Sequence, residues 1–389
     1  TIQRMADSLS HRGPDDEGFY DSAPLRFGFR RLSIIDLAGG HQPMSDREQK
    51  IWLVFNGEIY NFKELRAELE SLGHVFQTRS DTEVIIHGYK QWGADVLARL
   101  NGMFGLAIWD QMRKRLIIAR DPMGIKIVYF YVDAQKLAFG SEIRAVLAGL
   151  GAMPEVDPVS LNLFLRYRYT PSPRTLFKGI QKLAPGTLLV VENNTVRIQR
   201  WYQFEPTISD RVPSDNEAKE ELLFLYKEAV KRHLLSDVPV GLLLSGGIDS
   251  GMLLGLMNLF GKNWKTYTIG YGKSYADDEL EDALFAIQGN SMDGVIASNT
   301  TLSREGIKSP KSQEAGGLSG APLTLRSRAM VAKITRLTAG RLPVVGVGGI
   351  LTPTDAHAMF DAGATLVQVY TGLIYAGPGL VQNILKEVL

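Results

Sequence analysis

The sequence predicts an α+β domain followed by an α/β region. In residues 1–205, several short apolar segments typical of strands occur together with two segments typical of helices. From residue 240 onward, strand-like segments are each followed by a turn and a helix-like segment, which is the pattern of a parallel sheet. The 389 residues are enough for two or three domains.

The composition is that of a globular protein, with 45% hydrophobic and 22% charged residues. A formal net charge of +1 argues against a dedicated nucleic-acid binder. No apolar run is long enough to span a membrane and no secretory leader is visible, so we expect a cytoplasmic protein. The absence of cysteine excludes disulfides, thiolate metal sites and a cysteine nucleophile within these residues.

The sequence of residues 1–205 predicts strands and helices in the following places. The apolar runs at 32–35 and 51–55 indicate buried strands. A helix is expected over 61–73, and a second over 81–93 with Asp81 as its N-cap and a glycine at its end. Further strands are predicted at 115–119, 126–131 and 137–140.

The stretch VGLLLSGGIDS (240–250) is the centre of the second region. Its apolar run at 240–244 predicts a parallel strand covered on both faces, and the apolar residues 252–260 predict a helix. The glycines between them free backbone N–H groups for an anion, and the helix N-terminus adds partial positive charge. No Gly-Lys-Ser/Thr follows, so this is not a Walker A loop. A phosphate cradle is expected, and the alternative is a structural glycine-rich turn.

Six motifs in the first region follow the order found in one enzyme family. They are HRGPDDEG (11–18), RRLSIIDL (30–37), FNGEIYNF (55–62), SDTEVI (80–85), LNGMFGLAIWD (100–110) and ARDPMGIK (119–126). Together they resemble the glutaminase domain of glutamine-hydrolysing asparagine synthetases. The resemblance implies an Ntn-hydrolase αββα sandwich over residues 1–205.

The same resemblance implies a glutamine site. Asn56 and Gly57 match the oxyanion hole, in which a side-chain amide and a backbone N–H stabilise the tetrahedral intermediate. Arg31 matches the residue that holds the α-carboxylate of glutamine. Glu58 and Asp81 match the residues that hold its α-amino group.

The family's nucleophile is an N-terminal cysteine whose own α-amino group is the base. This chain has no cysteine, and Thr1 stands at the predicted start of the helix that precedes residues 11–18. We expect that the strand with the cysteine is missing by truncation. The alternative is that Thr1 itself is the nucleophile.

SDVPVGLLLSGGIDS (236–250) continues the asparagine synthetase pattern and resembles the pyrophosphate loop of ATP pyrophosphatases. The resemblance implies part of an α/β synthetase domain over residues 206–288 that uses ATP and aspartate. In it, Leu243 and Ile269 flank the adenine, and Asp249 binds Mg²⁺. The pyrophosphate is held by Ser245, Gly246, Gly247 and Ser250.

Four other motifs follow the point where the synthetase pattern stops. MDGVIASNTT (292–301), EAGGLSGAPL (314–323), LPVVGVGGI (342–350) and AGATLVQVYTGLIYAGP (362–378) resemble the C-terminal part of a quinone-type dihydroorotate dehydrogenase. The resemblance implies a partial (β/α)8 barrel over residues 289–389, with Asn299 and Thr300 at the dihydroorotate or orotate ring. The residues implied for FMN, chiefly at its phosphate, are Ser298, Gly320, Gly349, Tyr370 and Thr371. The alternative is a barrel phosphate site for another ligand.

Both patterns are incomplete, and their join is expected within residues 283–291. The synthetase part lacks the family's lysine for the aspartyl-adenylate, and the barrel part lacks the flavin lysine and the catalytic serine. Three barrel strands alone would leave two unpaired edges and an uncovered inner face. Three hypotheses stay open: an ATP-dependent glutamine amidotransferase that makes asparagine, an FMN-dependent dihydroorotate dehydrogenase, and a chimeric chain with neither activity.

Overall fold

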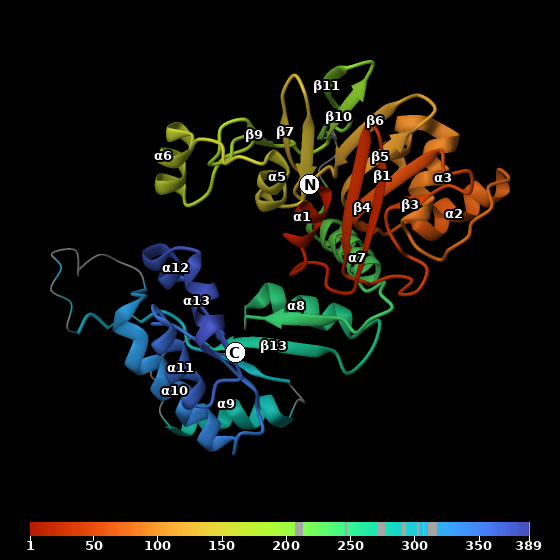
Figure 1. The fold of residues 1–389 in the computed structure, drawn as a ribbon. Helices are drawn as coiled ribbons and strands as arrows, with labels where there is room; N and C mark the ends of the chain where they lie inside the picture. Colours follow the sequence, from red (N-terminus) through yellow and green to blue (C-terminus); the bar gives the residue numbers. More distant parts are fainter. Residues whose placement is uncertain are drawn as a thin grey trace. The chain divides into compact units, whose positions relative to one another are not determined.

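The computed structural model describes residues 1–206, 213–245, 247–270, 277–289, 293–301, 303–305, 307, 309 and 317–388. The chain divides into two compact units (Figure 1). Unit 1 contains residues 1–221 and 232–238, and unit 2 contains residues 222–231 and 239–389. Parts of the predicted motifs and of the predicted join lie outside the described residues, namely Gly246, 274–276, 290–292 and 314–316.

The centre of unit 1 is a six-stranded sheet with the order β11-β10-β6-β5-β4-β3. Successive residues of its strands face opposite sides, as the period of a sheet requires. In β4, Leu53 and Phe55 enter one hydrophobic cluster and Val54 enters another on the opposite face. The strands are β3 (Met44–Ser45), β4 (Ile51–Ile59), β5 (Gly102–Asp110), β6 (Arg115–Arg120), β10 (Thr187–Glu192) and β11 (Thr195–Arg200).

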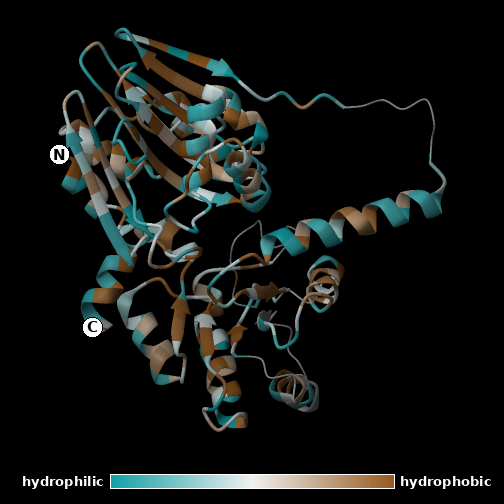
Figure 2. Ribbon diagram, turned by 90° about the vertical axis from the view of Figure 1, so that its right-hand side faces the viewer, coloured by the Kyte–Doolittle hydropathy of each residue, from teal (hydrophilic) through white to brown (hydrophobic). Residues whose placement is uncertain are grey.

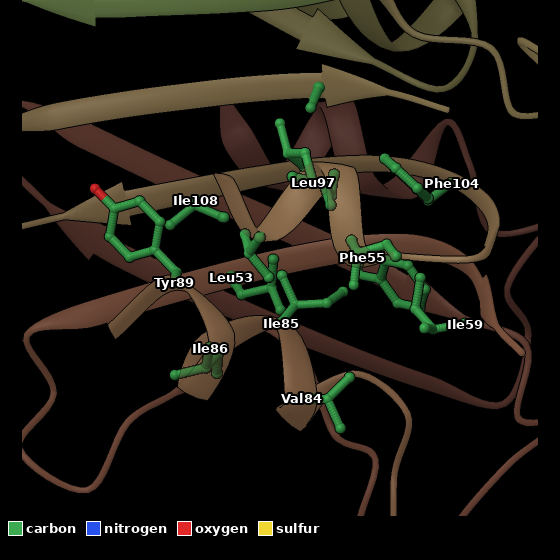
Figure 3. Packing of buried hydrophobic residues seen from close by; sticks show 14 of the residues in the cluster. Leu53, Phe55, Ile59, Val84, Ile85, Ile86, Tyr89, Leu97, Phe104 and Ile108 are labelled. Carbon is green, nitrogen blue, oxygen red and sulfur yellow. The ribbon is translucent and has the colours of Figure 1, made fainter. Parts of the chain in front are cut away.

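Helices cover one face of this sheet. α2 (Phe62–Ser71) and α3 (Glu83–Trp92) confirm the two predicted helices, and Figure 3 shows Ile85 of α3 beside Leu53 of β4. Each fully buried aliphatic side chain of this kind stabilises the fold by roughly 1.5–3 kcal/mol. Two short helices, η1 (Gly93–Asp95) and α4 (Val96–Arg99), follow α3.

Two smaller sheets pack on the other face and share its hydrophobic cluster. One pairs β1 (Asp16–Ser22) with β2 (Leu25–Arg31), and the other has the order β8-β7-β9. Helices α1 and α5 pack against each other, and α5 packs on β8. The remaining elements are α1 (Ile2–Asp7), β7 (Tyr129–Val132), β8 (Leu137–Gly140), α5 (Ile143–Leu150), α6 (Pro158–Tyr167) and β9 (Ile180–Lys182).

Two local predictions in unit 1 are wrong. Residues 32–35 are not a strand, because β2 ends at Arg31 and the next residues form a loop whose carbonyls contact the Arg31 guanidinium. Asp81 is not the N-cap of α3, since Thr82 occupies that position. The carboxylate of Asp81 instead accepts a hydrogen bond from the backbone of β4.

Unit 2 is built on one parallel sheet with the order β12-β13-β14-β15-β16. β13, from the synthetase-like part of the sequence, pairs with β14, from the dehydrogenase-like part, so that Thr268 lies opposite Val295. The prediction that the three C-terminal strands have two unpaired edges is therefore wrong at β14. The strands are β12 (Gly241–Leu244), β13 (Lys265–Gly270), β14 (Val295–Ala297), β15 (Val344–Val347) and β16 (Leu366–Gln368).

Helices follow the strands of this sheet, and those from α9 onward build one hydrophobic cluster with β14, β15 and β16. Sequential parallel strands joined by right-handed crossovers place their connecting helices on one face. On the other face, Leu243 and Leu366 are 68% and 62% exposed, so the predicted coverage of 240–244 on both faces is wrong. The helices are α7 (Asp215–His233), which spans both units, α8 (Ile248–Met257), α9 (Asp277–Gly289), η3 (Ala321–Leu323), α10 (Thr324–Leu337), α11 (Pro353–Asp361), α12 (Thr371–Ala376) and α13 (Gly379–Val388).

Hydrophobic residues follow the strands of both units in Figure 2. Among the described helices, none combines the length and the apolar character that a membrane crossing requires.

Candidate functional site

All five residues predicted to bind glutamine line one cavity of unit 1, whose volume is ≈ 1050 Å³. They come from the end of β2, from β4 and from the turn before α3. Thr1 also lines the cavity and is the N-cap of α1, as the sequence predicts. The cavity therefore brings together predicted glutamine residues that are up to 50 positions apart, since Arg31 and Asp81 share it.

The Arg31 guanidinium is buried and already has partners. Nη2 donates to the carbonyls of Ile35 and Asp36 at 2.9 and 2.8 Å, and Nη1 donates to Leu37 at 3.1 Å. A Cβ on Gly40 would lie 2.0 Å from Nη2, so a side chain at this position would displace the guanidinium. Arg31 thus shapes the 32–39 loop, and only its remaining N–H groups can meet a ligand carboxylate.

Strand β4 presents three of the predicted residues in succession. In β4, Asn56, Gly57 and Glu58 lie opposite residues 103–105 of β5. A Cβ on Gly57 would lie 2.1 Å from the Met103 carbonyl oxygen, which explains the glycine at this position. The ladder with β5 holds the 56–57 backbone in one orientation, as an oxyanion hole requires.

Two carboxyl groups of the cavity are held away from water. Burial raises the pKa of Asp81 to about 6, although a hydrogen bond from the Ile59 N–H at 2.9 Å opposes the shift, and the nearby Glu58 charge adds to it. Burial also raises the pKa of Glu58, against the opposing charges of Lys126 and His233. Two desolvated carboxylates in one cavity favour a cationic ligand group between them.

Two cavity residues were missed from the sequence. Gln42 is buried, donates from Nε2 to the Phe55 carbonyl at 3.1 Å and accepts from the Phe55 N–H at 2.7 Å. It thereby supports β4 one residue before Asn56. Lys126 lines the cavity from a loop that the fully buried Asp121 holds by accepting its N–H at 2.9 Å. Gln42 precedes a proline and belongs to none of the six motifs, so the sequence offers no clear signal for it, whereas Lys126 is the last residue of the ARDPMGIK motif.

The predicted phosphate loop joins β12 to α8, which begins at Ile248 rather than at residue 252. Ser245 and Ser250 meet there, with their hydroxyl oxygens 3.1 Å apart. Asp249 lies exposed in the first turn of α8. Ile269 belongs to β13, next to β12 in the sheet, but its side chain lies outside the described residues.

A second cavity, of ≈ 240 Å³, lies at the carboxyl ends of β14, β15 and β16. Its glycine-rich wall is fixed by hydroxyl groups: Thr324 Oγ1 donates to the Gly349 carbonyl at 2.7 Å, and Ser327 Oγ donates to Gly348 at 2.6 Å. Gly349 has a φ of +73°, and a Cβ there would lie 2.3 Å from the Thr324 nitrogen. All seven residues predicted for flavin and orotate line it: Ser298, Asn299, Thr300, Gly320, Gly349, Tyr370 and Thr371.

The residues present fit parts of the implied groups. Mg²⁺ commonly binds through one or two carboxylates together with substrate phosphates, which the single Asp249 would allow. The described residues contain no group of three or more potential metal-ligating side chains. The cavity of ≈ 240 Å³ is smaller than the roughly 300–1,000 Å³ of ordinary small-molecule pockets, so it fits a phosphate group rather than a whole flavin.

A family model for glutamine amidotransferase domains matches residues 1–202, which is more than half of the chain. The chain belongs to the glutamine amidotransferase family. Beyond this amidotransferase domain, a model for asparagine synthase matches residues 221–288 and one for dihydroorotate dehydrogenase matches residues 274–389. The last two matches overlap over 274–288, most of which lies in α9.

Curated relatives match the first two thirds of this chain. Asparagine synthetase [glutamine-hydrolyzing] 1 of Bacillus subtilis is 36% identical over 69% of this chain and 42% of its own length. Asparagine synthetase 3 of the same bacterium is 37% identical over 70% and 45%, and a putative asparagine synthetase of Mycobacterium tuberculosis is 36% identical over 69% and 44%. The chain therefore spans less than half the length of these relatives.

Among solved structures, the dihydroorotate dehydrogenase (DHODH) of Eimeria tenella in complex with ferulenol is 35% identical. The match covers 33% of this chain and 34% of that chain, with a TM-score of 0.31.

Proposed function

We propose that residues 1–205 form an Ntn-hydrolase-type glutaminase domain with an αββα arrangement, and that this domain binds glutamine. The proposal assigns it to an asparagine synthetase-like amidotransferase, which uses ATP to move nitrogen from glutamine to aspartate in the cytoplasm. One observation carries it: the five residues implied by the family motifs line a single cavity, and two of them are desolvated carboxylates.

Each residue has a distinct role in this proposal. Glu58 and Asp81 bind the ammonium group of glutamine, because a cation offsets the cost of ionising one buried and one partly buried carboxyl group. The N–H groups of Arg31 that remain free bind the α-carboxylate. The Asn56 side chain and the Gly57 N–H then stabilise negative charge that develops on the side-chain carbonyl oxygen of glutamine.

The chain supplies binding and polarisation without a thiolate. Its 389 residues contain no cysteine, so cysteine-type attack on glutamine is not available from within them. We therefore expect glutamine binding without hydrolysis. Glutaminase activity above blank that disappears in Thr1→Ala would show that Thr1 is a nucleophile and would contradict this expectation.

Calorimetric titration of the full chain with glutamine tests the proposal. We expect saturable binding that is lost in Asp81→Ala and kept in Asp157→Ala, since Asp157 caps α6 and does not line the cavity. Absence of binding to the unaltered chain would overturn the proposal. Binding that survives in Asp81→Ala would overturn the assigned role of the carboxylate.

The synthetase part is assigned to residues 206–288. Ser245, Gly246, Gly247 and Ser250 would hold the pyrophosphate of ATP, Asp249 its Mg²⁺, and Leu243 with Ile269 the adenine. Leu243 is 68% exposed, so it would cover an adenine on one side only. We expect no aspartate-dependent exchange of pyrophosphate into ATP. Exchange that is lost in Asp249→Ala would contradict this expectation.

A second candidate function is phosphate-end binding of FMN by residues 289–389. It is favoured by the ≈ 240 Å³ cavity, which is lined by all seven residues that the dehydrogenase motifs imply. In (β/α)8 barrels, phosphate groups bind to backbone N–H groups of the loops that follow the strands. Dihydroorotate oxidation would need the isoalloxazine enclosed as well, so we propose phosphate binding without this oxidation.

A further inference from the structure

Residues 233–238 follow the amidotransferase match, yet they belong to unit 1 and contact the elements that carry the glutamine residues. They comprise the last residue of α7 and the turn that leads toward β12. Ser236 shapes this turn, because its hydroxyl group accepts from the Val238 N–H at 3.1 Å and donates to the Val238 carbonyl at 3.0 Å. Leu235 packs against the hydrophobic cluster under the large sheet.

Asp237 makes two hydrogen bonds to the 32–39 loop. Its N–H donates to the Ile34 carbonyl at 2.9 Å, and its Oδ2 accepts from the Asp36 N–H at 2.7 Å. The second bond is charge-assisted and therefore stronger than a neutral one. The same loop offers its carbonyls at residues 35–37 to the Arg31 guanidinium. Asp237 thus fixes the loop that orients Arg31.

Asp36 extends this connection to the second predicted site element. Its Oδ2 accepts from the Arg79 N–H at 2.8 Å, two residues before Asp81, and its Oδ1 accepts from the Gly39 N–H at 3.0 Å. A carboxylate that binds backbone N–H groups of two loops holds them in one relative position. The backbone of Asp36 is in turn held by Asp237.

The other end of the segment contacts the third site element. His233 Nε2 lies 3.0 Å from the Tyr60 hydroxyl group, and Tyr60 follows β4 two residues after Glu58. His233 also lies near enough to Glu58 for its charge to oppose the rise in the Glu58 pKa that burial causes. The 233–238 segment therefore contacts the 32–39 loop and Tyr60 directly, and it is connected to residue 79 through Asp36.

We propose that Asp237 is a positioning residue of the glutamine site, which holds the 32–39 loop so that Arg31 and Asp81 face the same cavity. This inference rests on the proposed glutamine binding. It assigns part of that site to residues beyond the amidotransferase match, within the 221–288 segment that the asparagine synthase model matches.

The test compares Asp237→Ala and Asp237→Asn in the full chain. Alanine removes the acceptor for the Asp36 N–H, and we expect it to raise the Kd for glutamine roughly ten-fold, as expected for one lost hydrogen bond to a charged group. Asparagine keeps an acceptor oxygen of the same reach and should restore most of the affinity. Asp157→Ala is the matched control, because it also removes a carboxylate that accepts loop and cap hydrogen bonds in unit 1.

Hydrogen exchange separates positioning from a general loss of stability. In Asp237→Ala, deuterium uptake should rise in peptides that cover 32–39 and 79–81, while uptake in α2 and α3 stays unchanged. A glutamine Kd in Asp237→Ala equal to that of the unaltered chain would overturn the inference alone. Equal weakening in the alanine and asparagine variants would overturn it too, and absence of binding to the unaltered chain would overturn it together with the proposed function.

Discussion

At the scale of single residues, the chemistry of the cavity depends on the burial of Asp81. This carboxyl group is 5% exposed, and hydrogen bonds from the Ile59 N–H and the Ser80 hydroxyl group support its ionised form. Burial is the main cause of the raised pKa values of both Asp81 and Glu58, and the Glu58 charge adds to the rise at Asp81. Ionising both carboxyl groups costs free energy when the cavity is empty, and a bound cation offsets this cost.

Glutamine binding should therefore weaken in mild acid. The pKa of Asp81 is about 6, so its charge is present above that pH and is lost as the pH falls through it. Between pH 7.5 and pH 5 the ionised fraction falls about ten-fold, and we expect the Kd for glutamine to rise by a similar factor. Calorimetric titration at several pH values measures this. A Kd that does not change over this range would argue against Asp81 as the ammonium ligand.

Asp81→Asn should stabilise the protein while it abolishes glutamine binding. Because folding raises the pKa of Asp81, the folded state is more stable when this group is protonated. That stability is lost as the pH rises through about 6. At pH 7.5 the ionised group costs about 3 kcal/mol, and asparagine removes most of this cost while it still accepts from Ile59.

Urea unfolding at pH 7.5 and pH 4 measures this effect on the free energy of unfolding. The gain should be present at pH 7.5 and nearly absent at pH 4, where Asp81 is already protonated. A gain of equal size at both pH values would point to a cause other than charge.

The glutamine residues could be predicted from local motifs, whereas their supports could not. Asn56 and Gly57 lie within a contiguous motif on one strand, so sequence order and site coincide. Gln42 and Asp237 act through backbone contacts with residues 13 and 201 positions away. Such contacts depend on how the chain folds back on itself. A glutamine or an aspartate in the sequence does not indicate which distant backbone group it will contact.

At the scale of elements, the turns after the parallel strands decide what unit 2 can bind. Strands β14, β15 and β16 are three or four residues long. The glycine-containing turns that follow them line the ≈ 240 Å³ cavity. The motifs predicted these strands, because the apolar segments and glycines lie close together in sequence. The pairing of β13 with β14 was not predicted, since it joins segments from two family patterns.

Gly349→Ala should destabilise unit 2 by about 1 kcal/mol or more, since alanine is strained at positive φ and its Cβ would lie 2.3 Å from the Thr324 nitrogen. Gly255→Ala is the opposite case. Gly255 lies within α8 with open space around a Cβ, so alanine should stabilise the helix by about 0.5–1 kcal/mol. Denaturant unfolding of the two variants checks both signs. Equal effects would mean that the turn at 348–349 is not formed as described.

At the scale of the whole molecule, the chain combines parts of two enzyme families in one folded unit. Residues 239–389 form a compact unit although the asparagine synthase match ends at 288 and the dehydrogenase match begins at 274. The domain boundaries at 205 and 288 stay predictions. The continuous sheet from β12 to β16 gives the C-terminal strands a partner in β13.

The purified protein should accordingly be colourless and should not reduce a quinone with dihydroorotate. The cavity can take the phosphate end of FMN, but it is too small for the whole flavin. Visible absorbance spectroscopy after incubation with excess FMN and gel filtration measures retention. A yellow protein with stoichiometric FMN would contradict this expectation, and Gly349→Val would then show whether the flavin occupies the cavity.

The strand order of the unit 2 sheet has a consequence for how the chain reaches its fold. Each strand pairs with the next one along the chain, from β12 to β16 without a crossing. Each pairing still has to close a crossover, such as the one from Val295 to Val344, before its two parallel strands meet. During synthesis, each new strand can add to a sheet that already exists, because earlier segments leave the ribosome first. The join predicted within residues 283–291, a range that begins in α9, changes the family pattern of the next strand but leaves this stepwise order intact.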